Sequence, residues 1–147
     1  MGFSFPTTGV EGDRQRSVEL WATPRLSVGA WNQDGSTVMP LNLSDGAQGD
    51  SLTFDFTADA GTWTFELLHE TGPNRGIYTV IIDSGNVGTI DGYASFFPTD
   101  VIAFGKLVGV AIATSGAHLL ALSMLTKNAG ASAYYGAVSR ATFTRTD

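Results

Sequence analysis

The chain has 147 residues, the size of one ordinary domain, and its eight Lys and Arg against fourteen Asp and Glu give a net charge of −6. This acidic balance would repel a phosphate backbone, so we expect no nucleic-acid partner. Cysteine is absent, which excludes disulfides, thiolate metal sites and a cysteine nucleophile.

The first 16 residues are the least patterned part of the chain. They are polar, contain glycine and show no periodicity, so we expect an N-terminal arm at 1–16 followed by one β-sandwich domain at 17–147. Such arms often order only against a neighbouring subunit, and Phe3 and Phe5 are the candidate docking residues. The arm lacks a basic start followed by an apolar core, so we expect no secretory signal and synthesis in a cytoplasm.

Alternation of apolar and polar residues predicts strands along most of the chain. The strongest pattern is 52–57 followed by 62–67, and we expect these runs to pair antiparallel with a large aromatic inner face. A β-branched run at 76–83 leads through Asp83-Ser84-Gly85-Asn86 to a run at 87–90. This pattern predicts a hairpin in which glycine supplies the positive φ.

The other predicted strands are 18–21, 26–31, 37–43, 106–113, 117–126 and 132–144. The uncharged stretch 107–125 is near the length of a membrane span, but turn residues at 114–116 divide it, so we predict two strands and no membrane segment. Many short strands joined by turns predict an all-β fold. We expect an antiparallel two-sheet β-sandwich of the jelly-roll type.

The residues that most often carry catalysis are few and scattered. His69 precedes Glu70 at a strand end; the two could do acid/base work in a cleft, but a solvated strand end is the favoured interpretation. His118 alternates with apolar residues and is expected near the edge of the core. Neither histidine has metal-ligand spacing, and no G-x-S-x-G or phosphate-binding loop occurs. We therefore predict no catalytic residue, no metal, no cofactor and no enzyme activity.

Ligand binding is a separate question, and aromatic residues with a polar group are the candidates for contacting a ligand such as a sugar. Tyr134 and Tyr135 form the candidate ligand platform, because a tyrosine pairs an apolar ring with a polar tip. The same property suits a subunit interface. Asp83-Ser84-Gly85-Asn86 and Asp45-Gly46 do not match a dedicated calcium loop, and turn chemistry already explains them.

Several short segments together resemble a known family. They are GTWTFEL at 61–67, GIYTVIID at 76–83, VGTIDGY at 87–93, GAH at 116–118 and KN at 127–128. These segments are similar to the jelly-roll domain, related to galactose-binding and carbohydrate-binding modules, of tailed-bacteriophage structural proteins. The resemblance covers roughly residues 50–147 and consists mostly of turn and core positions. One departure is Ser84, which lengthens the expected Asp-Gly turn and weakens the case for a loop-borne ligand site.

The resemblance implies a virion component made in the host cytoplasm. It favours a capsid decoration protein, a minor capsid protein that forms a homo-oligomer, most commonly a trimer, and docks on the major capsid protein. The alternatives are a minor tail or fibre protein, with a tail protein as partner, and a carbohydrate-binding module that recognises surface glycans. Charged residues make up only 15% of the chain, below the roughly 25% usual in soluble domains. Either a covered interface or a surface of Thr, Ser and Gly would explain this.

Overall fold

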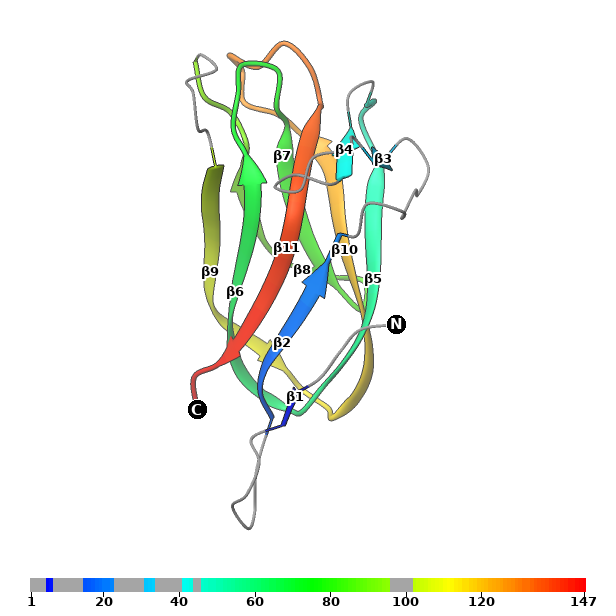
Figure 1. The fold of residues 1–147 in the computed structure, drawn as a ribbon, viewed down its shortest axis with the longest axis vertical. Helices are drawn as coiled ribbons and strands as arrows, with labels where there is room; N and C mark the ends of the chain where they lie inside the picture. Colours follow the sequence, from blue (N-terminus) through cyan, green and yellow to red (C-terminus); the bar gives the residue numbers. More distant parts are fainter. Residues whose placement is uncertain (1–4, 7–14, 23–30, 34–40, 44–45, 96–101) are drawn as a thin grey trace.

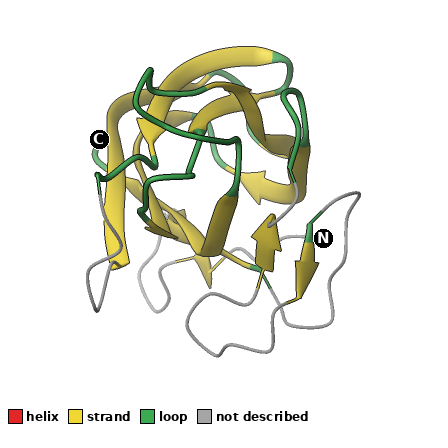
Figure 2. Cartoon of the chain, turned by 90° about the horizontal axis from the view of Figure 1, so that it is seen from above, coloured by secondary structure: helices red, strands yellow, loops and turns green. Residues whose placement is uncertain are grey.

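The computed structural model describes residues 5–6, 15–22, 31–33, 41–43, 46–95 and 102–147. These residues form two antiparallel sheets that pack face to face (Figure 1), and Figure 2 shows the two layers from above. The predicted all-β, two-sheet jelly-roll sandwich is confirmed. The described part contains no helix, and so no helix that is long and apolar enough to cross a membrane.

The larger sheet consists of β1 (Phe5–Pro6), β2 (Gln15–Trp21), β3 (Asn32–Gln33), β4 (Leu41–Leu43), β6 (Gly61–Glu70), β9 (Ile102–Ile112) and β11 (Gly136–Arg145). Its centre is β11, which pairs with β6 along one side and with both β2 and β4 along the other. The smaller sheet consists, in spatial order, of β5 (Ser51–Ala58), β10 (Gly116–Thr126), β7 (Ile77–Ile82) and β8 (Gly85–Asp91).

The strongest predicted strands exist, but the pairing predicted for them is wrong. β5 pairs with β10 in the smaller sheet, whereas β6 pairs with β9 and β11 in the larger one. Asp59 and Ala60 connect them and carry the chain from one sheet to the other. Both strands still turn their apolar residues inward, so the aromatic side chains meet across the core instead of along one sheet. Phe56 of β5 stacks on Phe143 of β11 with ring centres 4.9 Å apart.

The core fills the space between the sheets and follows the predicted alternation. Every second residue of β6 from Trp63 onward is buried, and the same holds for most of β10. The largest fully buried side chains are Trp31, Trp63, Tyr78, Phe56, Phe65, Phe143, Leu41, Leu43, Leu52, Leu67, Leu120 and Leu122. The stretch 107–125 forms the end of β9, a turn and most of β10, which confirms two strands and a turn.

Along one edge the sandwich closes because small residues face large ones. Gly105 of β9 lies directly beneath Ile90 of β8, and a Cβ added there would overlap the Cγ2 atom of Ile90. In return, Leu107 of β9 packs against Gly88 of β8. The two edge strands thus approach closely although they belong to different sheets.

The β7–β8 hairpin is confirmed, but its turn is built differently from the prediction. Asp83 and Ser84 occupy positive φ, at 50° and 72°, and Ile82 pairs with Gly85 across the two-residue loop. Gly85 is not among the residues with positive φ. Aspartate tolerates the left-handed region because its side chain bonds locally, and here the Asp83 carboxylate accepts a hydrogen bond from the amide of Leu119 at 2.8 Å.

Candidate functional site

Four residues from four neighbouring strands lie in one line across the outer face of the larger sheet. Arg140 of β11 lies opposite Trp21 of β2 and opposite Leu68 of β6. Leu68 in turn lies opposite Phe104 of β9. Their strand neighbours, such as Leu67, point into the core, so alternation directs these four side chains outward. We call Trp21, Arg140, Leu68 and Phe104 the aromatic row.

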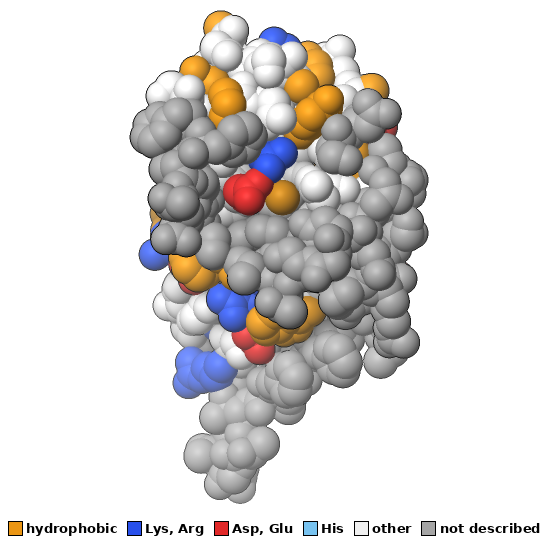
Figure 3. Space-filling model, turned by 45° about the horizontal axis from the view of Figure 1, so that its top comes forward, with side chains coloured by type: hydrophobic (Ala, Val, Ile, Leu, Met, Phe, Trp, Pro, Cys, Tyr) orange, Lys and Arg blue, Asp and Glu red, His pale blue; other side chains and the backbone are white. Residues whose placement is uncertain are grey.

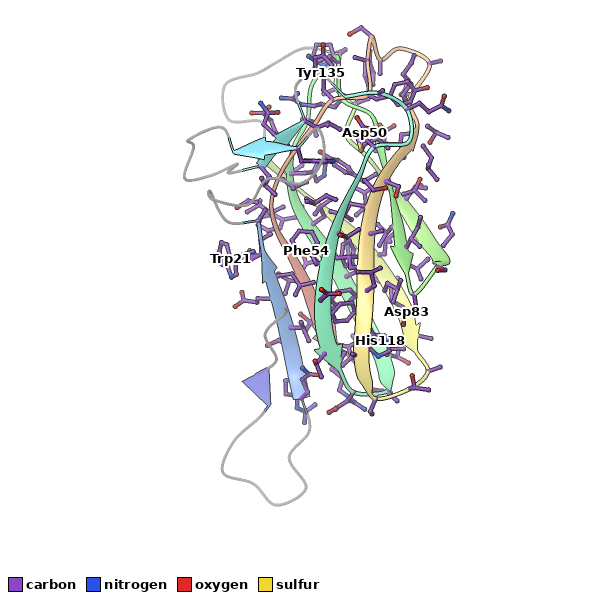
Figure 4. All side chains as sticks on the ribbon, turned by 90° about the vertical axis from the view of Figure 1, so that its right-hand side faces the viewer. Trp21, Asp50, Phe54, Asp83, His118 and Tyr135 are labelled. Atoms are coloured by element: carbon purple, nitrogen blue, oxygen red, sulfur yellow. The ribbon has the colours of Figure 1, made fainter. Side chains whose placement is uncertain are left out.

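The two rings of the aromatic row are exposed and share one cation. Trp21 is 49% exposed and Phe104 is 57% exposed, and Figure 4 shows the Trp21 side chain pointing away from the ribbon. The guanidinium carbon of Arg140 lies 5.1 Å from the centre of the Trp21 ring and 6.0 Å from that of Phe104. Cation–π attraction at these distances holds the guanidinium between the rings. The aromatic row is therefore arranged before any ligand arrives.

A second line of polar side chains runs directly beside the aromatic row. Thr142 lies opposite Glu19 and opposite Glu66, and Glu66 lies opposite Lys106. A carboxylate oxygen of Glu19 is 3.8 Å from a nitrogen of Arg140, an exposed ion pair worth at most about 1 kcal/mol. This face thus places ring surface next to hydroxyl, carboxylate and ammonium groups. It suits a ligand with an apolar face and a polar edge.

The sequence-predicted platform lies elsewhere, at one end of the sandwich. Tyr134 and Tyr135 belong to the connection between β10 and β11, and both are half-buried (Figure 4 labels Tyr135). Tyr134 packs against the core, and the Lys127 ammonium lies 5.9 Å from the centre of its ring. Figure 3 shows that apolar side chains gather at this end among polar ones. The role of the two tyrosines remains a prediction.

The two candidate docking residues can be placed only in part. Phe3 lies outside the described residues. Of Phe5 only the backbone is described: it belongs to β1, where it pairs with Ser17 of β2. Gln15 and Arg16, which the sequence assigned to the arm, open β2. Docking of the arm on a neighbour stays a prediction.

His69 does not lie at a solvated strand end, so that interpretation is wrong. Its side chain is 2% exposed, on the inner face of β6, and its ring meets Tyr78 edge-on with centres 5.3 Å apart. Glu70, the next residue, points the other way and pairs with Arg75. The two residues therefore form no acid/base pair. Burial in the core lowers the pKa of His69 to about 4, because a charged ring would lose its hydration.

His118 lies on the inner face of β10 with 7% exposure, as alternation predicted, and it holds a turn in place. Its Nδ1 is 2.5 Å from a carboxylate oxygen of Asp83, and its Nε2 donates to the Thr114 carbonyl at 2.8 Å. Figure 4 shows Asp83 and His118 together at the lower end of the sandwich. The bond from His118 is the main cause of a lowered pKa at Asp83. With both nitrogens engaged, the ring ties the β7–β8 turn to β10 and has no nitrogen left for chemistry.

Acidic side chains are spread over the structure. Across the described ranges, no three His, Asp or Glu side chains are placed so that they could hold one metal ion. Asp91, which faces the loops at the upper end, is bonded instead to the amide of Asn128 and to the backbone of Tyr93.

Comparison with known proteins identifies the kind of fold. No family model and no curated protein matches the sequence. The first CBM36 domain of a multidomain xylanase from the hindgut metagenome of Trinervitermes trinervoides is similar in structure. Its TM-score is 0.63 at 11% identity, and the match covers 89% of this chain and 98% of the module. A carbohydrate-binding module CBM36, solved in complex with calcium and xylotriose, has a TM-score of 0.61 at 15% identity over 86% of this chain and 98% of that one.

A third similar structure is a xanthan lyase from Paenibacillus, with a TM-score of 0.61 and 21% identity over 72% of this chain. This chain spans only 10% of the length of that lyase. At these identities the likeness shows the fold alone. The protein is an antiparallel jelly-roll β-sandwich, the fold that it shares with these modules.

Sequence reasoning missed the aromatic row for a topological reason. Trp21 ends the predicted strand 18–21, but Phe104 fell before the predicted strand at 106–113, so the sequence offered no reason to place the two rings on one face. Strand β9 in fact begins at Ile102, which gives Phe104 an outward position. The available signal was the spacing of Phe104 and Lys106: residues two apart in a strand share a face, so a solvent-facing Lys106 implies a solvent-facing Phe104. That Arg140 brings the two rings together depends on strand order, which alternation does not contain.

Proposed function

We propose that this protein is a non-catalytic glycan-binding module that holds its ligand on the aromatic row. The observation that carries the proposal is the pair of exposed rings, Trp21 and Phe104, fixed on either side of one guanidinium on a flat sheet face. The fold supports it, since two of the similar structures are carbohydrate-binding modules matched over 98% of their length.

The chemistry of a sugar suits this surface. One face of a pyranose ring presents mainly C–H groups and packs on an aromatic ring, while its hydroxyls lie around the edge. In this protein the hydroxyl partners are Glu19, Glu66, Thr142 and Lys106, each two residues along its strand from the aromatic row and so on the same face. A rigid sheet supports them, so little ordering is required on binding.

The test is retention of the purified protein on immobilised polysaccharides, followed by calorimetry with soluble fragments. The panel comprises xylan, galactan, cellulose, polygalacturonate and alginate. The double variant Trp21→Ala/Phe104→Ala should lose binding by at least about tenfold, because each removes a contact with one sugar ring. If no member of the panel is retained, or if the double variant binds as the wild type does, binding through the aromatic row is wrong.

Two control variants separate this surface from others. Val108→Ala removes an exposed apolar side chain on β9 outside the aromatic row and should leave retention unchanged. Tyr134→Ala/Tyr135→Ala tests the platform at the end of the sandwich. Loss of binding in this tyrosine variant alone would move the glycan site to the β10–β11 connection. All variants should keep the wild-type free energy of unfolding, measured by urea denaturation, within about 0.5 kcal/mol, as expected for surface changes.

The virion reading is the second candidate, and one structural observation favours it. In addition to the rings of the aromatic row, three large apolar side chains are exposed in the described part, namely Val108, Leu119 and Leu125. An oligomer or a capsid surface would cover such residues. In this reading the protein is a capsid decoration protein or a tail component, trimeric and located in the virion. Light scattering tests it: a stable trimer supports the reading, and a monomer that does not bind phage particles opposes it.

A further inference from the structure

The guanidinium of Arg140 is oriented by its neighbours but bonded weakly. Its side chain is 27% exposed and lies between the rings of Trp21 and Phe104. Within the described part of the chain its polar partner is Glu19, at 3.8 Å, which is beyond hydrogen-bond distance. A guanidinium has five N–H donors in a planar fork. Cation–π contact with the rings does not use these N–H groups as hydrogen-bond donors, so a ligand can accept hydrogen bonds from them.

The charge on this face differs from the charge of the whole chain. The aromatic row and the line of residues beside it contain two acidic residues, Glu19 and Glu66, and two basic ones, Lys106 and Arg140. The whole chain has a net charge of −6, so the negative excess lies elsewhere. An anionic ligand is repelled less here than by the molecule as a whole. Of the two cations, Arg140 lies opposite Trp21 and Lys106 lies two residues from Phe104 on β9.

We propose that the aromatic row selects glycans that carry carboxylates, the uronic acids. The proposal rests on the glycan binding proposed above and names its ligand class. A carboxylate is planar and has two oxygens at the spacing of the guanidinium fork, so it can accept two parallel hydrogen bonds from Arg140. The sugar that carries it then packs on Trp21 or Phe104. The ligand carboxylate then replaces Glu19 as the partner of Arg140, and the Glu19 carboxylate can accept a hydrogen bond from a sugar hydroxyl.

The experiment compares each acidic sugar with its uncharged form. Calorimetry at about 0.15 M salt, which screens distant charges, would use oligogalacturonate, glucuronate-bearing xylo-oligosaccharide and oligomannuronate, each beside its methyl ester. We expect at least one acid to bind about tenfold or more tighter than its ester, since hydrogen bonds between charged partners are the strong ones. Dextran sulfate distinguishes a planar carboxylate from any anion: equal affinity for the sulfate would overturn the assignment to uronic acids.

Arg140→Gln removes the charge and the fork, and the ratio between acid and ester affinities should fall to near one. Arg140→Lys keeps the charge but loses the fork and should give an intermediate ratio. Arg16→Gln is the matched control: it removes one exposed positive charge from β2 outside the row and should leave the ratio unchanged.

The outcomes separate the two proposals. If glycans bind through Trp21 and Phe104 but every acid binds like its ester, uronate selection is wrong and glycan binding stands. A ratio that survives in Arg140→Gln also overturns the selection mechanism. If no panel member binds at all, both proposals fall.

Discussion

The outer faces of the two sheets cover the same core but differ in composition. The larger sheet presents the aromatic row, which includes Arg140, and beside it three more charged residues, Glu19, Glu66 and Lys106. The outward positions of β5, β10 and β7 carry no aromatic ring: they hold small, β-branched and leucine side chains, with Asp55 as the charged residue. In a strand, inward positions fix the fold and outward positions are free to vary. The difference between the faces is the reason for placing the proposed glycan site on the larger sheet.

The core between the two sheets contains the residue whose protonation should affect stability most, His69. The pKa of His69 is about 4 in the folded protein and near 6.5 when unfolded, so below pH 6.5 the unfolded chain takes up a proton that the folded protein refuses. The free energy of unfolding should fall by about 3 kcal/mol from this residue alone between pH 7 and pH 4. Urea denaturation at pH 7, 6, 5 and 4 measures it. His69→Leu cannot titrate, so its stability should fall less, and parallel curves would contradict the assignment.

The edge where the two sheets meet should be the next most sensitive feature. Gly105→Ala places a methyl group against Ile90 and should destabilise the fold by about 2 kcal/mol, within the range for overpacked cores. Both sheets should unfold in a single transition, because they share one core. The double variant Gly105→Ala/Ile90→Ala relieves the overlap, so its loss should be smaller than the sum of the single losses. Additive effects would mean that the two strands do not touch at this point.

A change at the turn of the smaller sheet should have the smallest effect and should leave the aromatic row untouched. The carboxylate of Asp83 has a lowered pKa, so its contribution is present above pH 4 and is lost as the pH falls through the folded pKa. Because Asp83 is half-exposed, Asp83→Asn should cost no more than about 1 kcal/mol at pH 7 and less at pH 2. Thermal melts at both pH values measure the difference. Glycan retention should equal that of the wild type.

Alternation predicted most of the described strands and the inward position of His118, and turn residues predicted the hairpin 76–90, because each depends on residues close in the chain. The predicted strands at 26–31 and 37–43 lie mostly outside the described residues, which include only 31 and 41–43 of them. Pairing was harder to predict. A short link such as Asp59-Ala60 serves a hairpin or a crossing between sheets equally well, and only the packing of the two aromatic faces against each other decides. The aromatic row was not predicted for the same reason: Trp21 and Phe104 are brought onto one face through β11 and β6, strands that come from distant parts of the sequence. His69 is buried because β6 continues to Glu70, beyond the predicted run 62–67, and its alternation places His69 on the inner face.

The position of β11 has a consequence for how the molecule is made. β2, β4 and β6 precede it in the chain, yet all three pair with it, and β2 and β4 reach the sheet only through it. During synthesis the edges of β2, β4 and β6 that pair with β11 stay unpaired until β11 has left the ribosome, so the larger sheet is completed late and mostly through long-range contacts. We expect such a chain to fold slowly, with its unpaired edges prone to aggregation in the meantime.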